Sequence, residues 1–227
     1  MKRHKLATVA LGLVMGLSLI SAGGCAHKSR AAAKIATPAG SVMSAVVDPD
    51  PAHDPENVLL LDLSNGGRVA IRLVPQWAPR HVERIKLLAR QGFYNGQIFH
   101  RVIDGFMAQT GDPTGTGGGG SPLPDLTAEF NAIPHVRGSV SMARTEMPDS
   151  ANSQFFIVFY PHFALDRRYT NFGRVIAGMD VVDTIQRGEP AANPTKIVQA
   201  SIAVDGKPVP VRAAPVLAPA PKPVLAP

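Results

Sequence analysis

The stretch FHRVIDGFMAQTGD, residues 99–112, limits most strongly what this chain can fold into. From Ile98 onward, alternate side chains can point to opposite faces, as they do in a β-strand. Gly105 interrupts the alternation, so we expect two short strands joined at a bend. The hairpin would bring together one cation, two apolar side chains and one amide: Arg101, Phe106, Met107 and Gln109. This set holds no nucleophile and no carboxylate pair. It suits a site that grips an apolar group and directs hydrogen bonds at it, although a core hairpin with a surface arginine is the alternative.

A second stretch, within residues 138–157, extends the pattern. It reads GSVSMAR at 138–144 and, after a short loop, NSQFFI at 152–157. With FHRVIDGFMAQTGD, in this order and spacing, it resembles the two signatures of the cyclophilin-type peptidyl-prolyl cis-trans isomerases. The resemblance covers about residues 56–205. It implies a mainly β fold, a closed eight-stranded antiparallel barrel capped by two α-helices, with the active groove on the outer face.

Local patterns favour the same fold. Two apolar-rich segments, 58–64 and 68–75, flank Asn65-Gly66-Gly67, which is a strong hairpin signal. Pro79 can begin a helix, because a missing N–H costs nothing at that position, and apolar residues then recur at helical spacing until Gly92. Later elements are expected as a strand at 171–176, a short helix at 179–186 and a strand at 196–204.

The resemblance implies that Arg101 and Gln109 are the catalytic residues. Rotation about an X–Pro bond is slow because amide resonance sets a barrier near ~18–20 kcal/mol for a peptide bond. Twisting the bond localises a lone pair on the prolyl nitrogen. A donor aimed at that atom therefore forms its hydrogen bond only in the twisted state and stabilises that state. Arg101 suits this role because its guanidinium stays charged and carries a rigid fork of N–H groups. Gln109 can bond the substrate carbonyl or orient Arg101.

The proline ring must be held while the rest of the peptide rotates, which calls for an apolar pocket. The family's substrate-binding positions correspond to eight residues here: Phe106, Met107, Ala143, Arg144, Gln154, Phe156, Leu165 and Tyr169. Ala143 and Arg144 would line the peptide path, where backbone groups can pair with an extended substrate.

Three positions depart from the family pattern. Arg144 is typical of bacterial forms, whereas animal cyclophilins commonly have asparagine there. Tyr169 replaces a histidine, and we assign it the same place because it keeps an aromatic wall with a hydroxyl donor. The tryptophan that often precedes the leucine is replaced by Ala164, with Phe163 one place earlier.

Other chemistries fit the sequence poorly. The run at 115–120 satisfies G-x-G-x-x-G, but Ser121-Pro122-Leu123-Pro124 cannot open the helix that a dinucleotide site needs, so no cofactor is expected. The histidines lack close metal-binding spacing, so we expect no metal. Ser139 and Ser141 lack a paired base in any nucleophile motif, which disfavours a hydrolase.

The N-terminus resembles an export signal. Residues 1–24 have a charged head, an apolar run and small residues, the layout of a signal peptide. Cys25, the sole cysteine, follows Ala22-Gly23-Gly24 as in a bacterial lipobox, where the thiol carries a diacylglycerol. The commonest lipobox has leucine in place of Ala22, so ordinary cleavage and a soluble periplasmic product is the alternative. Of the 23 basic residues, three lie in this removable head, leaving 20 against 17 acidic ones, too mild a charge to indicate nucleic acid.

The regions around the domain are low in complexity. Residues 25–55 are polar and broken by proline, as in a flexible tether, and residues 206–227 form a Pro/Ala-rich tail that contains PVLAP twice. That tail is expected to be disordered, with a spacer or a docking segment as alternatives.

The intact set Arg101, Phe106, Gln109 and Phe156 favours an enzyme. We expect an exported, monomeric isomerase, lipid-anchored through Cys25 to a membrane facing the periplasm. Its partners would be proline-containing unfolded or flexible polypeptides, and it would assist the folding of envelope proteins. The alternative is a catalytically weak binding module that kept the barrel and lost turnover.

Overall fold

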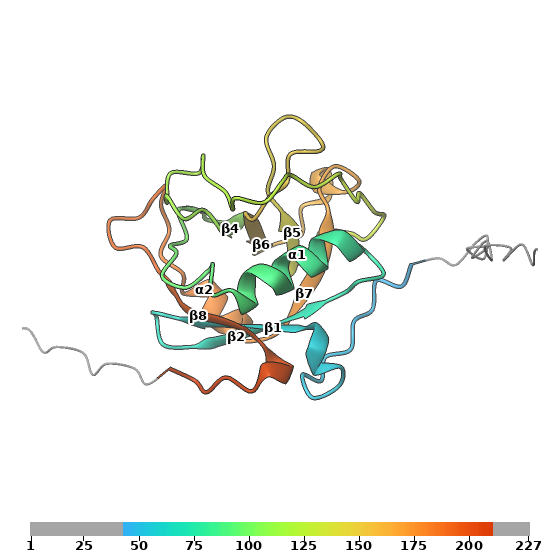
Figure 1. The fold of residues 1–227 in the computed structure, drawn as a ribbon. Helices are drawn as coiled ribbons and strands as arrows, with labels where there is room; N and C mark the ends of the chain where they lie inside the picture. Colours follow the sequence, from blue (N-terminus) through green and yellow to red (C-terminus); the bar gives the residue numbers. More distant parts are fainter. Residues whose placement is uncertain (1–42, 211–227) are drawn as a thin grey trace, which may run out of the picture. The chain divides into compact units, whose positions relative to one another are not determined.

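The computed structural model describes residues 43–210, and Figure 1 shows their arrangement. This part of the chain contains eight strands, two α-helices and three 3₁₀ turns. In chain order the strands and helices are β1 (Val58–Leu63), β2 (Arg68–Leu73), α1 (Pro79–Arg90), β3 (Arg101–Ile103), β4 (Met107–Thr110), β5 (Ser139–Met142), β6 (Phe155–Val158), β7 (Asn171–Ala177), α2 (Met179–Asp183) and β8 (Ile197–Ile202). The 3₁₀ turns are Pro55–Asn57, Phe163–Leu165 and Ala203–Asp205.

The strands form one curled antiparallel sheet in the order β3-β4-β6-β5-β7-β2-β1-β8. The expected closed barrel is wrong, because no ladder joins the edge strands β3 and β8 within residues 43–210. Only isolated bridges cross the gap, Ile98 to Lys196 and Val102 to Gly188. The segment that approaches β3 contains Pro190 and Pro194, which have no N–H to donate to a ladder. The sheet therefore remains a half-barrel.

Two apolar clusters lie on opposite faces of this sheet. The larger one fills the inside of the curl, where α1 packs with Val82, Ile85 and Leu88. The smaller one lies outside and consists of Met107, Phe156, Val158 and Leu165. Strand β6 serves both clusters, since its alternate residues Phe155 and Ile157 belong to the inner one. The period of two in a strand thus builds the core and an external apolar site from alternate residues of the same strand.

The helices follow the expected signals in part. Helix α1 begins at Pro79 and ends at Arg90, just before Gly92, whose φ of 71° favours glycine. The carboxylate of Glu129 accepts the backbone N–H groups of Arg80 and His81 and so caps the first turn. Helix α2 ends at Asp183 rather than at residue 186.

The segment before β1 contacts the sheet although residues 43–54 contain no helix or strand. The guanidinium of Arg72 on β2 donates to the carbonyl oxygens of Asp48, Asp50 and Asp54 at 3.3, 2.6 and 2.9 Å. Trp77 Nε1 donates to Ser44 O at 3.0 Å. Ordered contacts therefore begin before residue 55, the predicted end of the tether. The predicted signal peptide, Cys25 and most of the Pro/Ala-rich tail lie outside the described residues.

Candidate active site

Arg101, Gln109 and Phe156 form a row across three neighbouring strands. Arg101 on β3 is opposite Gln109 on β4, and Gln109 is opposite Phe156 on β6. The two short strands joined at a bend, predicted from the sequence, are present, and Gly105 turns the chain with a φ of 69°. Residues directly opposite each other share a face of the sheet, so the three side chains point to the same outer surface.

A cavity of about 240 Å³ opens on this surface. It is lined by both predicted catalytic residues and by seven of the eight predicted substrate-binding residues: Arg101, Gln109, Phe106, Met107, Ala143, Arg144, Phe156, Leu165 and Tyr169. Met107, Phe156 and Leu165 are buried and form its floor and one wall. The Tyr169 ring packs edge-on against Phe156, with 5.6 Å between centroids. The Tyr169 ring thus forms an aromatic part of the cavity lining.

At the rim of the cavity, the guanidinium of Arg101 forms an ion pair through one of its three nitrogens. Arg101 Nε lies 3.2 Å from Glu189 Oε2, and both side chains are well exposed. Within residues 43–210, the two Nη atoms of Arg101 form no hydrogen bond. Two N–H-bearing atoms therefore remain available to a ligand in the cavity.

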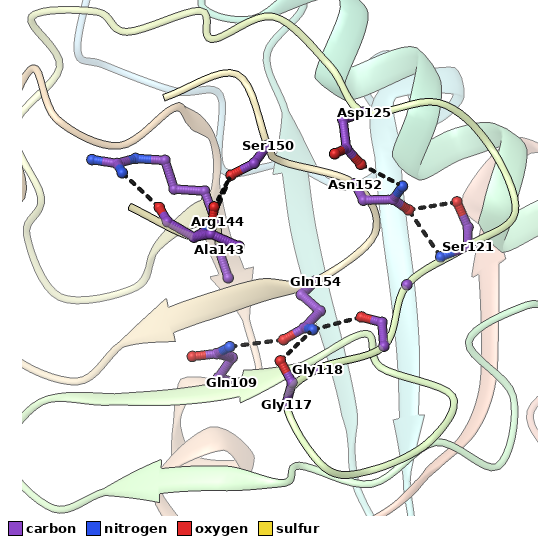
Figure 2. A pocket seen from close by; sticks show the side chains of 13 residues that line it. Gln109, Gly117, Gly118, Ser121, Asp125, Ala143, Arg144, Ser150, Asn152 and Gln154 are labelled. Atoms are coloured by element: carbon purple, nitrogen blue, oxygen red, sulfur yellow. Dashed lines mark hydrogen bonds between the residues drawn. The ribbon is translucent and has the colours of Figure 1, made fainter. Parts of the chain in front are cut away.

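Gln154 is the one predicted substrate-binding residue outside this cavity. Gln109 Nε2 donates to Gln154 Oε1 at 2.9 Å, and Gln154 Nε2 donates to the carbonyl oxygens of Gly117 and Gly119 at 3.0 and 2.7 Å, as Figure 2 shows. Gln154 thereby fixes which end of the Gln109 amide faces the groove. It lines a neighbouring hollow of about 450 Å³, together with the glycine-rich loop, Gln109, Ala143 and Arg144.

Asp112, which ends the first motif, organises the glycine-rich loop. Its carboxylate accepts the backbone N–H groups of Thr114, Thr116 and Gly117 and the Thr114 hydroxyl, at 2.6–3.1 Å. Burial opposes ionisation of this group, but the hydrogen bonds from Thr114, Gly119 and Gly117 outweigh it and lower the pKa of Asp112 to about 2. The loop beside the groove is therefore folded around a buried anion.

Arg144 acts as a clamp rather than as a free cation. Nε and Nη2 donate to Arg168 O at 3.1 and 3.0 Å, and Nη1 donates to Thr145 O at 2.8 Å. The guanidinium carbon lies 4.7 Å from the centre of the Tyr169 ring. Since these contacts occupy the side chain, Arg144 shapes the groove wall by holding Tyr169 and the following loop.

Several residues that shape the site were not predicted. Ser141 does have a base within reach, because its Oγ lies 2.8 Å from His135 Nε2, and His135 Nδ1 lies 2.8 Å from Asp166 Oδ1. Ser141 and His135 are fully buried, so the serine cannot meet a substrate. His162 was also missed, and its ring packs on Phe106 with 4.7 Å between centroids. Ser141 lies within the second signature, but neither His135 nor His162 lies in a motif that would have singled it out.

Two further observations concern the described residues, 43–210. No group of three or more His, Cys, Asp or Glu side chains among them is arranged to hold a metal ion. None of their helices has the length and apolar character needed to cross a bilayer.

Comparisons with known proteins agree with this geometry. Residues 59–203 match the family model described as cyclophilin type peptidyl-prolyl cis-trans isomerase/CLD. The chain is 48% identical over 193 residues to a probable peptidyl-prolyl cis-trans isomerase of Brucella suis, covering 78% of this chain and 95% of that one. It is 42% identical over 127 residues to a peptidyl-prolyl cis-trans isomerase-like 3 of Rattus norvegicus, covering 53% of this chain and 77% of that one.

Solved structures point the same way. The cyclophilin AquaCyp293 from Hirschia baltica is 32% identical, with a TM-score of 0.62 and coverage of 67% of this chain and 76% of that chain. A cyclophilin type isomerase of Cryptosporidium parvum, crystallised in the presence of the dipeptide Ala-Pro, is 27% identical, with a TM-score of 0.59 and coverage of 64% and 98%. The chain therefore belongs to the cyclophilin-type peptidyl-prolyl cis-trans isomerase family.

Proposed function

We propose that this cyclophilin-type isomerase rotates X–Pro bonds of unfolded or flexible polypeptides in the groove around Arg101, and that it assists the folding of envelope proteins. The observation that carries the proposal is the cross-strand row of Arg101, Gln109 and Phe156 beside the cavity of about 240 Å³. This row combines a charged donor, an amide and an apolar floor on one surface. The Cryptosporidium parvum relative, crystallised in the presence of Ala-Pro, supports a proline-containing ligand.

The chemistry follows from which group is held and which group rotates. The proline ring enters the apolar cavity over Met107, Phe156 and Leu165 and is held there. As the X–Pro bond twists, its nitrogen loses amide conjugation and gains a lone pair. An Nη–H group of Arg101 donates to that lone pair, which exists only in the twisted state, so the interaction lowers the barrier. Gln109, whose Nε2 is held by Gln154, presents its Oε1 as an acceptor to the peptide beside the ring.

The peptide path has fewer free backbone groups than expected. The N–H of Ala143 already donates to Gln154 O at 2.9 Å. Pairing with an extended substrate is therefore left to the carbonyl of Ala143 and the N–H of Arg144.

The location of this activity is the cell envelope. The charged head, apolar run and lipobox-like Cys25 support export and a lipid anchor on a membrane facing the periplasm. Ordinary cleavage in place of lipidation would give a soluble periplasmic form with the same activity. The chain acts as a monomer in this proposal.

The test compares turnover with binding on one short peptide that contains a single Ala-Pro bond. In a protease-coupled assay, the wild-type protein should accelerate the cis-to-trans step well above the uncatalysed rate. A catalytically weak binding module would give an unchanged rate while calorimetric titration still showed peptide binding. That second outcome would overturn the enzymatic proposal and favour the module.

A further inference from the structure

His135 is fully buried, and each of its backbone and ring polar atoms takes part in a hydrogen bond. Its backbone N–H donates to Asp166 Oδ1 at 2.8 Å, and its ring Nδ1 lies 2.8 Å from the same oxygen. Its ring Nε2 lies 2.8 Å from Ser141 Oγ. Its carbonyl accepts the N–H of His162 at 2.8 Å. Through these four hydrogen bonds, the buried His135 holds Ser141, His162 and Asp166 in one arrangement.

Two of these partners bracket one wall of the proline pocket. His162 and Asp166 immediately flank the 3₁₀ turn Phe163–Leu165, whose Leu165 side chain lines the cavity. The His162 ring packs on Phe106, another lining residue. His135 is thus bonded to both ends of the segment that supplies this wall.

The third partner lies beside the pocket floor, on the same face of the sheet. Ser141 on β5 is directly opposite Phe156 on β6, and Phe156 forms the floor. The imidazole of His135 therefore links β5, the strand next to the floor residue Phe156, to the turn that forms the wall. The distance between wall and floor determines how tightly a proline ring fits.

The proton arrangement on this link follows from its partners. A carboxylate only accepts, so Nδ1 of His135 carries the proton toward Asp166, and Nε2 accepts the Ser141 hydroxyl. Burial lowers the pKa of His135, and the Asp166 carboxylate opposes this only in part. Ser141, His135 and Asp166 are linked in the order of a hydrolase triad. Because Ser141 is fully buried, it cannot reach a substrate, and the three residues have a structural role instead.

We propose that His135 is a positioning residue of the isomerase, which sets the Leu165 wall of the proline pocket through its Nδ1–H bond to Asp166. This inference rests on the proposed function for its kinetic readout. Peptide affinity provides a readout that does not need turnover.

The test separates the two ring nitrogens of His135. In His135→Asn the side-chain amide replaces Nδ1 and keeps the bond to Asp166, whereas in His135→Gln it replaces Nε2 and keeps the bond to Ser141. The proposal expects the Asn variant to retain peptide affinity and kcat/KM. It expects the Gln variant to lose about fivefold to tenfold in kcat/KM, the typical effect of one buried hydrogen bond, mainly through KM.

His81 provides a matched control. It is also fully buried, and both its backbone N–H and its Nδ1 contact one carboxylate, that of Glu129, but it lines neither hollow of the groove. His81→Gln should lower the melting temperature as His135→Gln does and leave peptide affinity unchanged. Methyl NMR signals of Leu165 should shift in His135→Gln and remain in place in His81→Gln.

If neither His135 variant folds, Asp166→Asn weakens the same link from its partly exposed end and should reproduce the loss of affinity. Equal losses in His135→Asn and His135→Gln would overturn the proposal, as would full affinity in His135→Gln or in Asp166→Asn. Failure of turnover in the wild-type protein, with the affinity pattern intact, would count against the isomerase activity alone.

Discussion

Arg101 and Glu189, which are 88 residues apart in the sequence, form an ion pair with 3.2 Å between Nε and Oε2. The contact uses the nitrogen nearest the side-chain stem, so it leaves both Nη atoms to a ligand in the cavity that Arg101 lines. Because the pair is well exposed, it contributes little to the free energy of unfolding. Its effect is to orient the guanidinium of Arg101.

Replacing Glu189 tests this orientation. Glu189→Gln should lower kcat/KM about twofold to fivefold and leave the melting temperature unchanged, since an exposed pair is worth about 0–1 kcal/mol. Steady-state kinetics and thermal unfolding measure the two effects. Glu83→Gln, which removes an exposed carboxylate on α1, should change neither. A change in melting temperature without a change in rate would contradict the orienting role.

Removing Arg101 should affect turnover far more than binding. Arg101→Ala should lower kcat by on the order of 10²–10³, as loss of a transition-state donor does, while peptide affinity changes little. Arg101→Lys should also be poor, because a point charge does not reproduce the fork. Near-native turnover in Arg101→Ala, measured in the protease-coupled assay, would refute the mechanism.

Asp112 should make the stability of the domain depend on pH in the acid range. Its folded-state pKa of about 2 lies below the ordinary value of 3.8, so its carboxylate stabilises the fold above pH 3.8 and that contribution is lost as the pH falls toward 2. Asp112→Asn should therefore be less stable than wild type at pH 6, and the difference should shrink near pH 2. Urea unfolding at both pH values measures it, with the exposed Asp180→Asn as control.

Cyclosporin should inhibit this protein weakly compared with animal cyclophilins. The family resemblance implies that a tryptophan before the leucine packs on the drug and donates an N–H to it, and Ala164 offers neither. Phe163 is 62% exposed and is not among the residues that line the cavity. Ala164→Trp should raise drug affinity without changing turnover, as inhibition curves can show. Tight inhibition of the wild-type protein would mean that the contact is dispensable here.

Cys25→Ser should release the protein from membranes. A lipobox cysteine receives at least two acyl chains, which anchor stably, whereas one chain anchors only marginally. Fractionation of cells that express each form measures the change. If the wild-type protein is already soluble in the periplasm, Ala22 has prevented lipidation.

The side chains that lie together in the cavity come largely from contiguous motifs, so their proximity could be predicted from the sequence. Arg101, Phe106 and Gln109 follow from one hairpin, because its strand period and the bend at Gly105 determine which side chains meet. Glu189 could not be found this way, since a loop with no motif brings it to Arg101. The same holds for His135, which meets Asp166 across 31 residues.

The prediction of the fold was less complete at the two edge strands of the sheet, β3 and β8. The hairpin at Asn65-Gly66-Gly67 and helix α1 depend on local signals, and both are present. Closure of the barrel depends on how β3 meets the segment before β8, where Pro190 and Pro194 limit pairing. Edge geometry of this kind depends on tertiary contacts rather than on local pattern.

The alternation in β4 and β6 makes the groove tolerant of substitution and intolerant of insertion. Met107 and Phe156 face the cavity, while their neighbours Ala108 and Phe155 face the core. A single residue inserted into β4 would send every later side chain to the opposite face, turning Gln109 toward the core. Length changes in these two strands should therefore abolish folding and activity together, whereas the specificity of the pocket can diverge through exchanges at every second position.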